Sequence, residues 1–358
     1  MKKNTYINIE NILKLSEFKN FKLFSPSSIT PKNLILDDHN TDLERYIVGS
    51  HPVYSAINGD GRIVVPHSTK HYDSELDQGK NFSTGAYSKS TRTRKDKSKW
   101  LEHRIRCNGI FNTISTGHGG AFQSSLNVIR FGNKLRYLTP LECERLMSWP
   151  DYWTKYGKKE NGEIYELSDS ERYHLCGNGI VSEVPRIITS RITEKIKIFS
   201  TFSGADGSCL GLNDNFETVG FSEFDTTPSN LLRYQYPDLP NLGDITQIDI
   251  KKVPEFDLLF VSAPCQTFSK GSRNRAGFND ARGTLFFEAA KIIKERKPKY
   301  ILFENVKDMI NHDGGRTFEI IMRTFVELGY GGEVNVLNAS HYGVPQARER
   351  VFILAHRL

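Results

Sequence analysis

The feature that most constrains the fold of this chain is an alternation of short apolar runs and amphipathic stretches that begins near residue 196. Four runs predict strands buried on both faces: residues 196–202, 217–221, 257–261 and 300–303. Apolar residues at helical spacing predict helices at 286–295 and 318–328, and the runs at 333–337 and 351–355 predict an antiparallel closing pair. Strands that alternate with helices form mostly parallel sheets. The pattern therefore predicts an α/β fold with a doubly wound sheet.

The third of these runs ends in Ser262-Ala263-Pro264-Cys265-Gln266, so a cysteine lies just past the carboxyl end of a buried strand. Ligands of open α/β sheets bind at that edge. A thiol there is a candidate nucleophile, because thiolates attack soft electrophilic carbons well. Taken alone, Cys265 is more simply explained as a buried structural residue. The residues at the other strand ends are what favour the nucleophile.

Glycines follow the first predicted strand, in Phe202-Ser203-Gly204-Ala205-Asp206-Gly207-Ser208. At a strand-to-helix turn, glycines let a ligand approach the backbone, and an acidic residue about 20 positions later can hold ribose hydroxyls. Glu223, at the end of the second predicted strand, has that position. The glycine pattern alone also fits other nucleotide binders and ordinary turns. Together with Glu223 it favours an adenosine-type ligand.

Charged side chains mark two more places. Glu304 follows the strand at 300–303, where a carboxyl beside an apolar strand can hold or donate a proton, or can simply cap a helix. Near the end of the printed sequence comes Gln346-Ala347-Arg348-Glu349-Arg350. If this stretch is extended, Arg348 and Arg350 share one face and Glu349 points away.

Composition excludes several classes of protein. The chain has 358 residues, of which 38% are hydrophobic and 25% charged, values typical of a folded globular protein with room for two domains. No run is long enough to span a membrane and no apolar signal region is visible, so an intracellular protein is expected. The five cysteines contain no C-x-x-C pair, which argues against both a zinc site and a disulfide framework.

The positive charge is concentrated in the first third. Residues 1–125 hold 18 Lys and Arg against 12 Asp and Glu, whereas the rest of the chain holds 30 of each. Nine basic and two acidic residues lie within 80–106. This segment is predicted to be either a phosphate-contacting surface or a solvated loop.

The first 110 residues otherwise predict little regular structure. One short helix at 9–18 and one strand at 62–66 are expected, and the segment 83–94 has the composition of a nucleic-acid-contacting loop or of a linker. Further on, Thr139-Pro140-Leu141-Glu142 is a capping box whose helix should end at Trp149-Pro150. Gly177-Asn178-Gly179-Ile180-Val181 precedes a second helix that should reach about residue 192.

The strand-end stretches, in this order, resemble the C5-cytosine DNA methyltransferase family. That family places a Pro-Cys-Gln loop, a Glu-Asn-Val stretch and a Gln-x-Arg-x-Arg stretch on a fold that binds S-adenosylmethionine. Three more segments are similar to family motifs: Gly243-Asp244-Ile245, residues 277–287 and residues 338–345. The resemblance covers about residues 110–358.

Two segments resemble the ninth and tenth family motifs but lie in an unusual place. They are residues 136–150 and Gly177-Asn178-Gly179-Ile180, and both precede the glycine loop, whereas in the usual family order they follow the recognition region. The order resembles a circular permutation, which protein folds tolerate at exposed connections. It requires the helix after Asn178 to pack beside the first strand. It also implies a smaller, irregular target-recognition domain at 1–172 and a catalytic domain at 173–358.

The resemblance implies methyl transfer from S-adenosylmethionine to C5 of a cytosine flipped out of duplex DNA. It implies that the Cys265 thiolate attacks C6, that Glu304 contacts the N3/N4 edge, that Arg350 holds O2 and that Arg348 lies near the thiolate. It also implies a loop at 266–282 that closes on phosphates. The implied cofactor-binding residues are Phe202, Ser203, Gly204, Gly207, Glu223, Phe224, Asp244, Ile245, Pro264 and Asn178. The implied DNA-binding residues are Gln266, Ser269, Arg273, Arg275, Arg92, Arg94, Lys95 and Lys97.

The chain departs from the family pattern at three points. Ser262-Ala263 stands before the Pro-Cys where the family usually has glycine or phenylalanine. Asp206 replaces a common glycine, although aspartate tolerates left-handed geometry better than most residues. Gly179 replaces the usual serine and could weaken hydrogen bonding on the cofactor side.

The expected partner is double-stranded DNA, without a metal or a membrane. The sequence leaves open whether the chain acts beside a cognate restriction endonuclease for the same site or as an orphan enzyme. The expected location is the cytoplasm of a prokaryote, associated with the nucleoid. Three alternatives stay open: an RNA cytosine methyltransferase on the same core, a DNA-binding module with a silent methyltransferase fold, and a nucleotide-dependent oxidoreductase. The oxidoreductase would explain the glycines and Glu223 but not the Pro-Cys-Gln.

Overall fold

The computed structural model describes the backbone of residues 21–23, 56–57, 62–66, 84–93, 99–106, 111–116, 125–131, 134–264 and 285–358. Side chains are described for residues 111–116, 127, 137–264 and 285–358. The predicted helix at 9–18 lies outside these residues. Within the described part of the chain, no helix combines the length and the apolarity that a membrane span requires.

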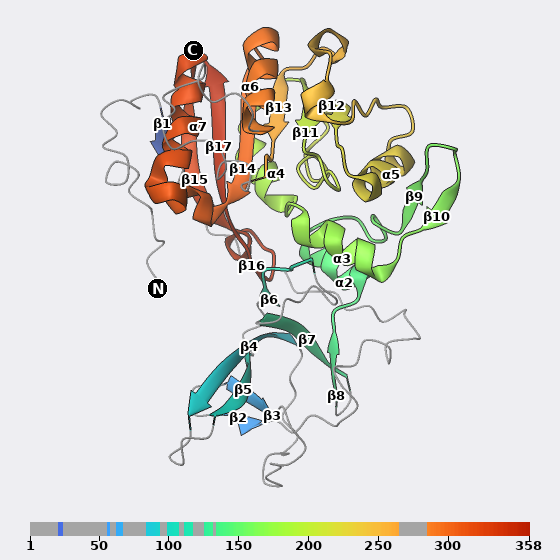
Figure 1. Cartoon of the computed structure of the whole chain (residues 1–358), viewed down its shortest axis with the longest axis vertical. Coiled ribbons are helices and arrows are strands. Elements are labelled where there is room, and N and C mark those ends of the chain that lie inside the picture. The colour runs from blue at the N-terminus through green and yellow to red at the C-terminus, as the bar shows by residue number, and fades with distance from the viewer. Residues whose placement is uncertain are drawn as a thin grey trace.

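The larger part of the described structure is built around a seven-stranded mixed sheet (Figure 1). Its strands, in spatial order, are β1 (Phe21–Leu23), β15 (Tyr330–Asn338), β17 (Glu349–Arg357), β14 (Tyr300–Val306), β13 (Leu258–Val261), β11 (Ile196–Thr201) and β12 (Phe216–Ser222). The four strands β12, β11, β13 and β14 run parallel, and β17 is antiparallel to both β14 and β15. The predicted α/β sheet and its antiparallel closing pair are confirmed.

Both faces of this sheet are buried, as the short apolar strands predicted. In β13, Leu259 and Val261 join one hydrophobic cluster, and Leu258 and Phe260 join the other. The first cluster contains α6 (Leu285–Arg296) and α7 (Arg316–Glu327), both predicted from helical spacing. The second contains residues of α5 (Thr226–Gln235), which the sequence did not predict. Because side chains alternate along a strand, a strand that is apolar at every position serves two cores at once.

Three helices before the glycine loop cover the second face: α2 (Pro140–Leu146), α3 (Asp169–Asn178) and α4 (Glu183–Thr189). The capping box of α2 is present, with Thr139 and Glu142 hydrogen-bonded reciprocally to each other's backbone N–H. This helix ends three residues before the predicted Trp149, since Ser148 adopts a left-handed φ of 58°. Helix α4 packs in the same cluster as Ile196 and Ile198 of β11, the neighbourhood that was expected for the helix after Asn178.

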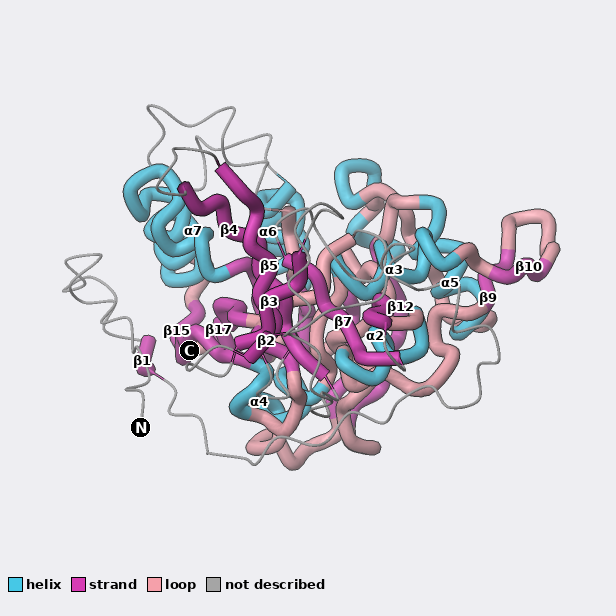
Figure 2. The backbone as a smooth tube through the Cα atoms, turned by 90° about the horizontal axis from the view of Figure 1, so that it is seen from below, coloured by secondary structure: helices cyan, strands magenta, loops and turns pink. Residues whose placement is uncertain are grey.

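The prediction that the first third is irregular was wrong. A six-stranded sheet has the order β2 (Ala56–Ile57), β3 (Arg62–Pro66), β5 (Lys99–Arg106), β4 (Thr84–Thr93), β7 (Ser125–Phe131) and β8 (Lys134–Tyr137). All of its pairs are antiparallel, and Figure 2 shows its strands from below. The segment predicted as a loop at 83–94 is largely β4. Its threonines and tyrosine suit a strand, and partners on β5 and β7 supply the pairing that its own periodicity did not reveal.

A short bridge joins the two parts of the chain. Strand β6 (Phe111–Asn112) pairs in parallel with β16 (Gln346–Ala347), just before β17. A hairpin of β9 (Tyr156–Lys158) and β10 (Ile164–Glu166) lies beside α5 (Figure 1). The predicted domain boundary between residues 172 and 173 falls inside α3. The division into two domains stays a prediction.

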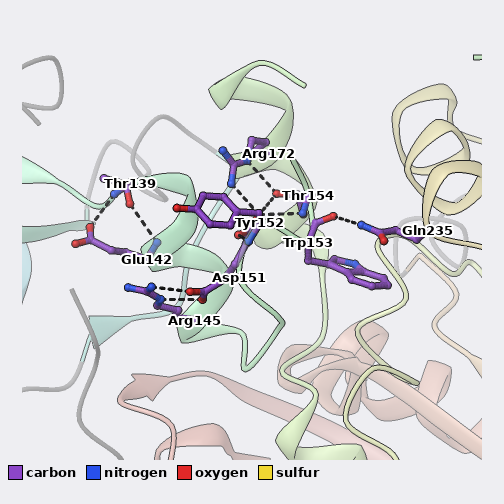
Figure 3. A network of polar contacts seen from close by, with 10 residues as sticks. Thr139, Glu142, Arg145, Asp151, Tyr152, Trp153, Thr154, Arg172 and Gln235 are labelled. Atoms are coloured by element: carbon purple, nitrogen blue, oxygen red, sulfur yellow. Dashed lines mark hydrogen bonds and ion pairs between the residues drawn. The ribbon is translucent and has the colours of Figure 1, made fainter. Parts of the chain in front are cut away.

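A buried polar network fixes the segment that follows α2 (Figure 3). Glu144 is fully buried and accepts hydrogen bonds from the backbone N–H of Tyr152 at 2.8 Å and of Thr154 at 2.9 Å, and from the Thr154 hydroxyl. Arg172 of α3 donates to the same carboxylate at 2.9 Å and to the Thr154 hydroxyl at 3.1 Å. Because Glu144, Thr154 and Arg172 are all buried, each of the three depends on the others for its hydrogen bonds.

We expect Arg172→Leu to lower the free energy of unfolding by about 3–5 kcal/mol, because it leaves Glu144 buried without its cation. Urea denaturation followed by circular dichroism measures the change. The matched control is Lys159→Ala, which removes an exposed ion pair with Glu163 and should cost less than about 1 kcal/mol. Equal losses for the two variants would contradict the importance given to the buried network.

Candidate active site

Three neighbouring strands bring polar side chains together around Glu304. The Glu304 carboxylate, 5% exposed, accepts a hydrogen bond from the Ser262 hydroxyl on Oε2 at 2.7 Å. Arg350 Nε lies 3.2 Å from Oε1 of the same carboxylate. Ser262 follows β13, Glu304 belongs to β14 and Arg350 to β17, and these strands are adjacent in the sheet. The predicted catalytic residues Glu304 and Arg350 are therefore in contact.

The neighbouring Asn305 holds the end of β13 in place. Its Nδ2 donates to the Ala263 carbonyl at 2.8 Å, and its Oδ1 accepts from the Val306 N–H at 2.9 Å. Pro264, which comes next, is exposed. This bond extends the contact between β13 and β14 past the last paired residues, so it sets where the chain leaves the sheet towards Cys265.

Several predicted site residues lie outside the described part of the chain: Cys265, Gln266, Ser269, Arg273, Arg275, Arg94, Lys95 and Lys97. Arg92 lies in β4, where its backbone is opposite Trp100 of β5. The DNA-contacting roles of all these residues stay predictions.

The described cysteines are poor candidates for a nucleophile. Burial raises the pKa of Cys143, Cys176 and Cys209 well above the usual thiol value. A thiol that stays protonated near neutrality is a weak nucleophile. Within the described part of the chain, no group of three or more His, Cys, Asp or Glu side chains could hold a metal ion.

Arg348 has different partners from Arg350. Its guanidinium, 3% exposed, donates to three backbone carbonyls: Ile114 at 3.0 Å, Gly177 at 2.8 Å and Gly179 at 2.6 Å. Gln346 makes two similar hydrogen bonds. Its Nε2 donates to the Leu146 carbonyl at 2.8 Å, and its Oε1 accepts from the Ile114 N–H at 3.1 Å. Both side chains thus bind the end of the sheet to segments far away in the sequence. The predicted proximity of Arg348 to the Cys265 thiolate stays a prediction.

The glycine loop leaves β11 through three left-handed residues. Phe202, Gly204 and Asp206 have φ values of 55°, 53° and 61°. Glu223, directly after β12, accepts a hydrogen bond from the Gly204 N–H at 2.7 Å and one from the Asp225 N–H at 2.7 Å. Burial raises the pKa of Glu223, and these two N–H donors oppose the rise. The structure thus joins the two halves of the predicted cofactor site.

Asn241, which the sequence did not single out, connects Glu223 with the loop at Gly243. Its Oδ1 accepts from the N–H of both residues, at 3.0 Å and 3.1 Å, and its Nδ2 donates to the Glu223 carbonyl at 3.1 Å. Asp244 follows and caps a short 3-10 turn (Ile245–Gln247) through the Thr246 N–H. The sequence signal that could have identified Asn241 is a short polar residue two positions before the Gly243-Asp244 turn.

The ring of Phe224 is 72% exposed beside the buried Glu223. A Cβ placed on Gly204 or on Gly243 would meet no atom within 4 Å, so open space adjoins both loops. Glu223 is hydrogen-bonded to the Gly204 N–H, and Asp244 directly follows Gly243. Open backbone, an exposed aromatic ring and two acidic side chains suit a ligand with a flat base, hydroxyls and amino groups.

Two tryptophans after α2 pack near the glycine loop and donate hydrogen bonds that restrain it and the neighbouring segment. Trp149 Nε1 donates to the Ile180 carbonyl at 2.9 Å, and Trp153 Nε1 donates to the Ala205 carbonyl at 2.9 Å. A Cβ on Gly179 would approach Trp149 Cζ2 to 2.4 Å, and one on Gly207 would approach the Ile180 carbonyl oxygen to 2.3 Å. Glycine at 179 is therefore required by packing, which explains why a serine is absent here.

Asn178, predicted to bind the cofactor, is exposed at the end of α3. Its Nδ2 lies 2.9 Å from His174 Nε2, one helical turn earlier. The following residues, Gly179 and Ile180, contact the glycine loop through Trp149 and Gly207. Asn178 itself has no described contact with that loop, and its cofactor role stays a prediction.

A model of the C-5 cytosine-specific DNA methylase family matches residues 6–194 and 196–358, so the chain belongs to this family. The orphan methyltransferase M.SPRI of Bacillus phage SPR is 42% identical over 168 residues, which are 46% of this chain and 38% of that protein. The type II methyltransferase M.HhaI of Haemophilus parahaemolyticus is 39% identical over 163 residues, 45% of this chain and 49% of that protein. A DNMT2 structure from Spodoptera frugiperda, 25% identical, covers 45% of this chain and 50% of its own at a TM-score of 0.36. The chain thus spans less than half the length of the two curated relatives.

We expect Arg348→Met to lower the free energy of unfolding by at least about 3 kcal/mol, because three buried carbonyls lose their donor. Chemical denaturation measures this. The matched control is Arg357→Met at the far end of β17, which removes one exposed bond to the Lys297 carbonyl and should change stability by less than about 1 kcal/mol. A stable Arg348→Met protein that has lost only its activity would instead favour the predicted catalytic role.

Asp206 should make stability depend on pH. Burial raises its pKa to about 7, although the Tyr236 hydroxyl donates to Oδ2 at 2.7 Å. Unfolded aspartate titrates near 3.9, so between about pH 4 and pH 7 the folded state holds a proton that the unfolded chain has released. Stability therefore falls as pH rises across this window and stays low above it.

Asparagine also tolerates the left-handed backbone and can accept from Tyr236. We expect Asp206→Asn to be more stable than the wild type at pH 8 by on the order of 2–4 kcal/mol, with little difference at pH 4. Urea unfolding at both pH values measures the difference. Asp238→Asn, at an exposed position, should change stability by less than about 0.5 kcal/mol at either pH. A constant difference between Asp206→Asn and the wild type would contradict the assignment.

Proposed function

We propose that this chain transfers a methyl group from S-adenosylmethionine to C5 of a cytosine in duplex DNA. The observation that carries the proposal is the position of Glu304. Its carboxylate is held between Ser262 and Arg350, beside the end of β13, which Ser262, Ala263 and Pro264 follow. In the sequence Cys265 comes next, in a chain that belongs to the C-5 cytosine-specific DNA methylase family.

In the proposed reaction, each group of the chain has one task. C5 of cytosine is a weak nucleophile until the Cys265 thiolate adds to C6 and converts the ring to an enamine-like form. Glu304 binds the N3/N4 edge and Arg350 binds O2, so that both stabilise charge that develops on the ring. C5 then forms a bond to the methyl carbon while the bond from that carbon to the donor sulfur breaks, and the electron pair of the broken bond stays on sulfur. Loss of the C5 proton and departure of the thiolate from C6 restore the aromatic ring.

The base must leave the duplex to reach these residues, because C5 and C6 are inaccessible to a nucleophile inside stacked DNA. Arg348 is proposed to lie close to Cys265 and to favour ionisation of its thiol. The loop from Gln266 to Arg282, with Ser269, Arg273 and Arg275, is proposed to close on the phosphates.

S-adenosylmethionine supplies the electrophilic methyl group when bound. The residues at and near these two loops fit it: Glu223 would hold the ribose hydroxyls, Asp244 the adenine amino group, and Phe202 and Phe224 the faces of the base. Gly204, Gly207 and Ser203 would let the chain approach the cofactor closely. Ile245, Pro264 and Asn178 complete the proposed set.

We also propose that the family motifs are circularly permuted in this chain. The ninth and tenth motif segments precede β11, and α4 is joined to β11 by six residues only. The bridge of β6 with β16 links the segment between two strands of the antiparallel sheet to the segment just before β17. Under this proposal, the six-stranded sheet within residues 1–172 recognises the target, and Arg92, Arg94, Lys95 and Lys97 contact DNA phosphates.

A biological role follows from the names of the relatives. They are type II and orphan methyltransferases from bacteria and phages. We propose that this chain protects DNA either beside a restriction endonuclease that acts on the same site or alone, in the cytoplasm of a prokaryote at its nucleoid.

The experiment that tests the activity expresses the chain in a bacterial host free of DNA methylation and maps 5-methylcytosine across the genome. We expect methylation at one recurring sequence, and none with Cys265→Ser, because serine is too weak a nucleophile for C6. Retained DNA binding by Cys265→Ser, measured on the mapped site, controls for folding.

Three outcomes would contradict the proposal. Full methylation by Cys265→Ser would exclude this nucleophile. Methylation confined to RNA would favour the RNA-modifying alternative. Sequence-specific DNA binding without any methylated product would favour a silent DNA-binding module.

A further inference from the structure

The hydroxyl that contacts Glu304 comes from Ser262, a position at which the chain departs from its family. The Ser262 Oγ donates to Glu304 Oε2 at 2.7 Å, a distance typical of a charge-assisted O–H···O bond. The sequence suggested no role for this residue. Its hydroxyl is the described side chain that contacts Oε2, whereas the partner of Oε1 is Arg350.

The contact follows from the register of the sheet. Strands β13 and β14 are parallel, and their last paired residues are Val261 and Phe303. Ser262 and Glu304 are each the next residue, so their side chains leave the same face of the sheet side by side. On the other side of β14, Glu304 is opposite Phe352, and Arg350 lies two residues away on the same face of β17. Glu304 therefore stands between a donor on each neighbouring strand.

Two donors on opposite sides define the plane of the carboxylate. The last torsion of a glutamate side chain is broad, because it joins an sp³ carbon to an sp² carbon. The ion pair with Arg350 alone would leave the group free to rotate about that torsion. With one oxygen hydrogen-bonded to Ser262 and the other paired with Arg350, rotation would break one of the two contacts. Each carboxylate oxygen keeps a further lone pair for a ligand.

We propose that Ser262 is a positioning residue for Glu304, and that it presents the carboxylate in the plane in which it meets the N3/N4 edge of the flipped base. The inference rests on the proposed methyl transfer. N3 and N4 both lie in the plane of the cytosine ring. To contact both atoms, the two carboxylate oxygens must lie in that same plane. A carboxylate that is free to turn satisfies this only part of the time.

The ion pair with Arg350 cannot replace the hydrogen bond from Ser262. Arg350 Nη1 donates to the Glu349 carbonyl at 2.8 Å, so its guanidinium is itself held on its own strand. It approaches Oε1 from β17, while Oε2 faces β13. Loss of the serine hydroxyl therefore removes the restraint on one side of the carboxylate only.

The test compares three variants of the full chain: Ser262→Ala, Ser262→Thr and Ser262→Val. Threonine and valine have nearly the same shape and differ in the hydroxyl, so their comparison separates hydrogen bonding from packing. The assay measures transfer of labelled methyl from S-adenosylmethionine to unmethylated phage λ DNA, under steady-state and single-turnover conditions. Thermal unfolding of each variant checks that it is folded.

We expect kcat to fall about tenfold in the alanine and valine variants, the effect of losing one bond to a charged group that orients a reacting site. KM for S-adenosylmethionine should stay within about twofold, because Glu223 and the glycine loop are untouched. The threonine variant should stay within about threefold of the wild-type kcat, since it keeps the donor.

The matched control is Ser200→Ala. Ser200 is buried in the adjacent strand β11, and within the described structure its hydroxyl has no hydrogen-bond partner. This variant should keep the wild-type kcat. Equal rates for the threonine and valine variants, or an alanine variant with the wild-type kcat, would overturn the role of Ser262 and leave the proposed function standing. A wild-type protein that transfers no methyl group would overturn both.

Discussion

The arrangement of the whole site depends on one buried guanidinium. Arg348 binds the carbonyls of Ile114, Gly177 and Gly179, which are 234, 171 and 169 residues away in the sequence. Burying a cation is costly unless its donors meet acceptors in the right places, so Arg348 can be buried only while these segments stay together. Arg348 thereby fixes three parts of the molecule relative to one another: the segment between β16 and β17, the C-terminal end of α3 and the segment after β6.

The glycine loop stores backbone strain that its surroundings compensate. A left-handed conformation is unfavourable at Phe202 and tolerated at Asp206, and it persists only where neighbouring contacts impose it. Glu223 binds the loop from β12, and Trp153 binds it from the segment after α2. The buried Glu144–Arg172 pair in turn fixes that segment, at a distance from any reacting group. Residues that resemble the ninth family motif thus shape the proposed cofactor site.

The sequence determined the elements whose cause is local. Apolar runs of strand length predicted β11 to β14, the capping box predicted the start of α2, and strand ends predicted the positions of Glu223 and Glu304. These inferences succeed because burial on both faces and helix capping depend on neighbouring residues. The sequence did not predict α5, or the antiparallel sheet of the first third, whose strands pair with partners distant in the sequence.

Only the tertiary structure decided what the charged side chains contact. Arg348 and Arg350 are two residues apart in one motif, yet the first binds backbone carbonyls from distant segments and the second binds Glu304. Ser262 and Glu304 meet because the register of two parallel strands places them side by side, 42 residues apart. The sequence by itself determined which groups are available for chemistry and at which strand ends they lie. Their pairing depends on register and on contacts between segments more than a hundred residues apart, which no local pattern encodes.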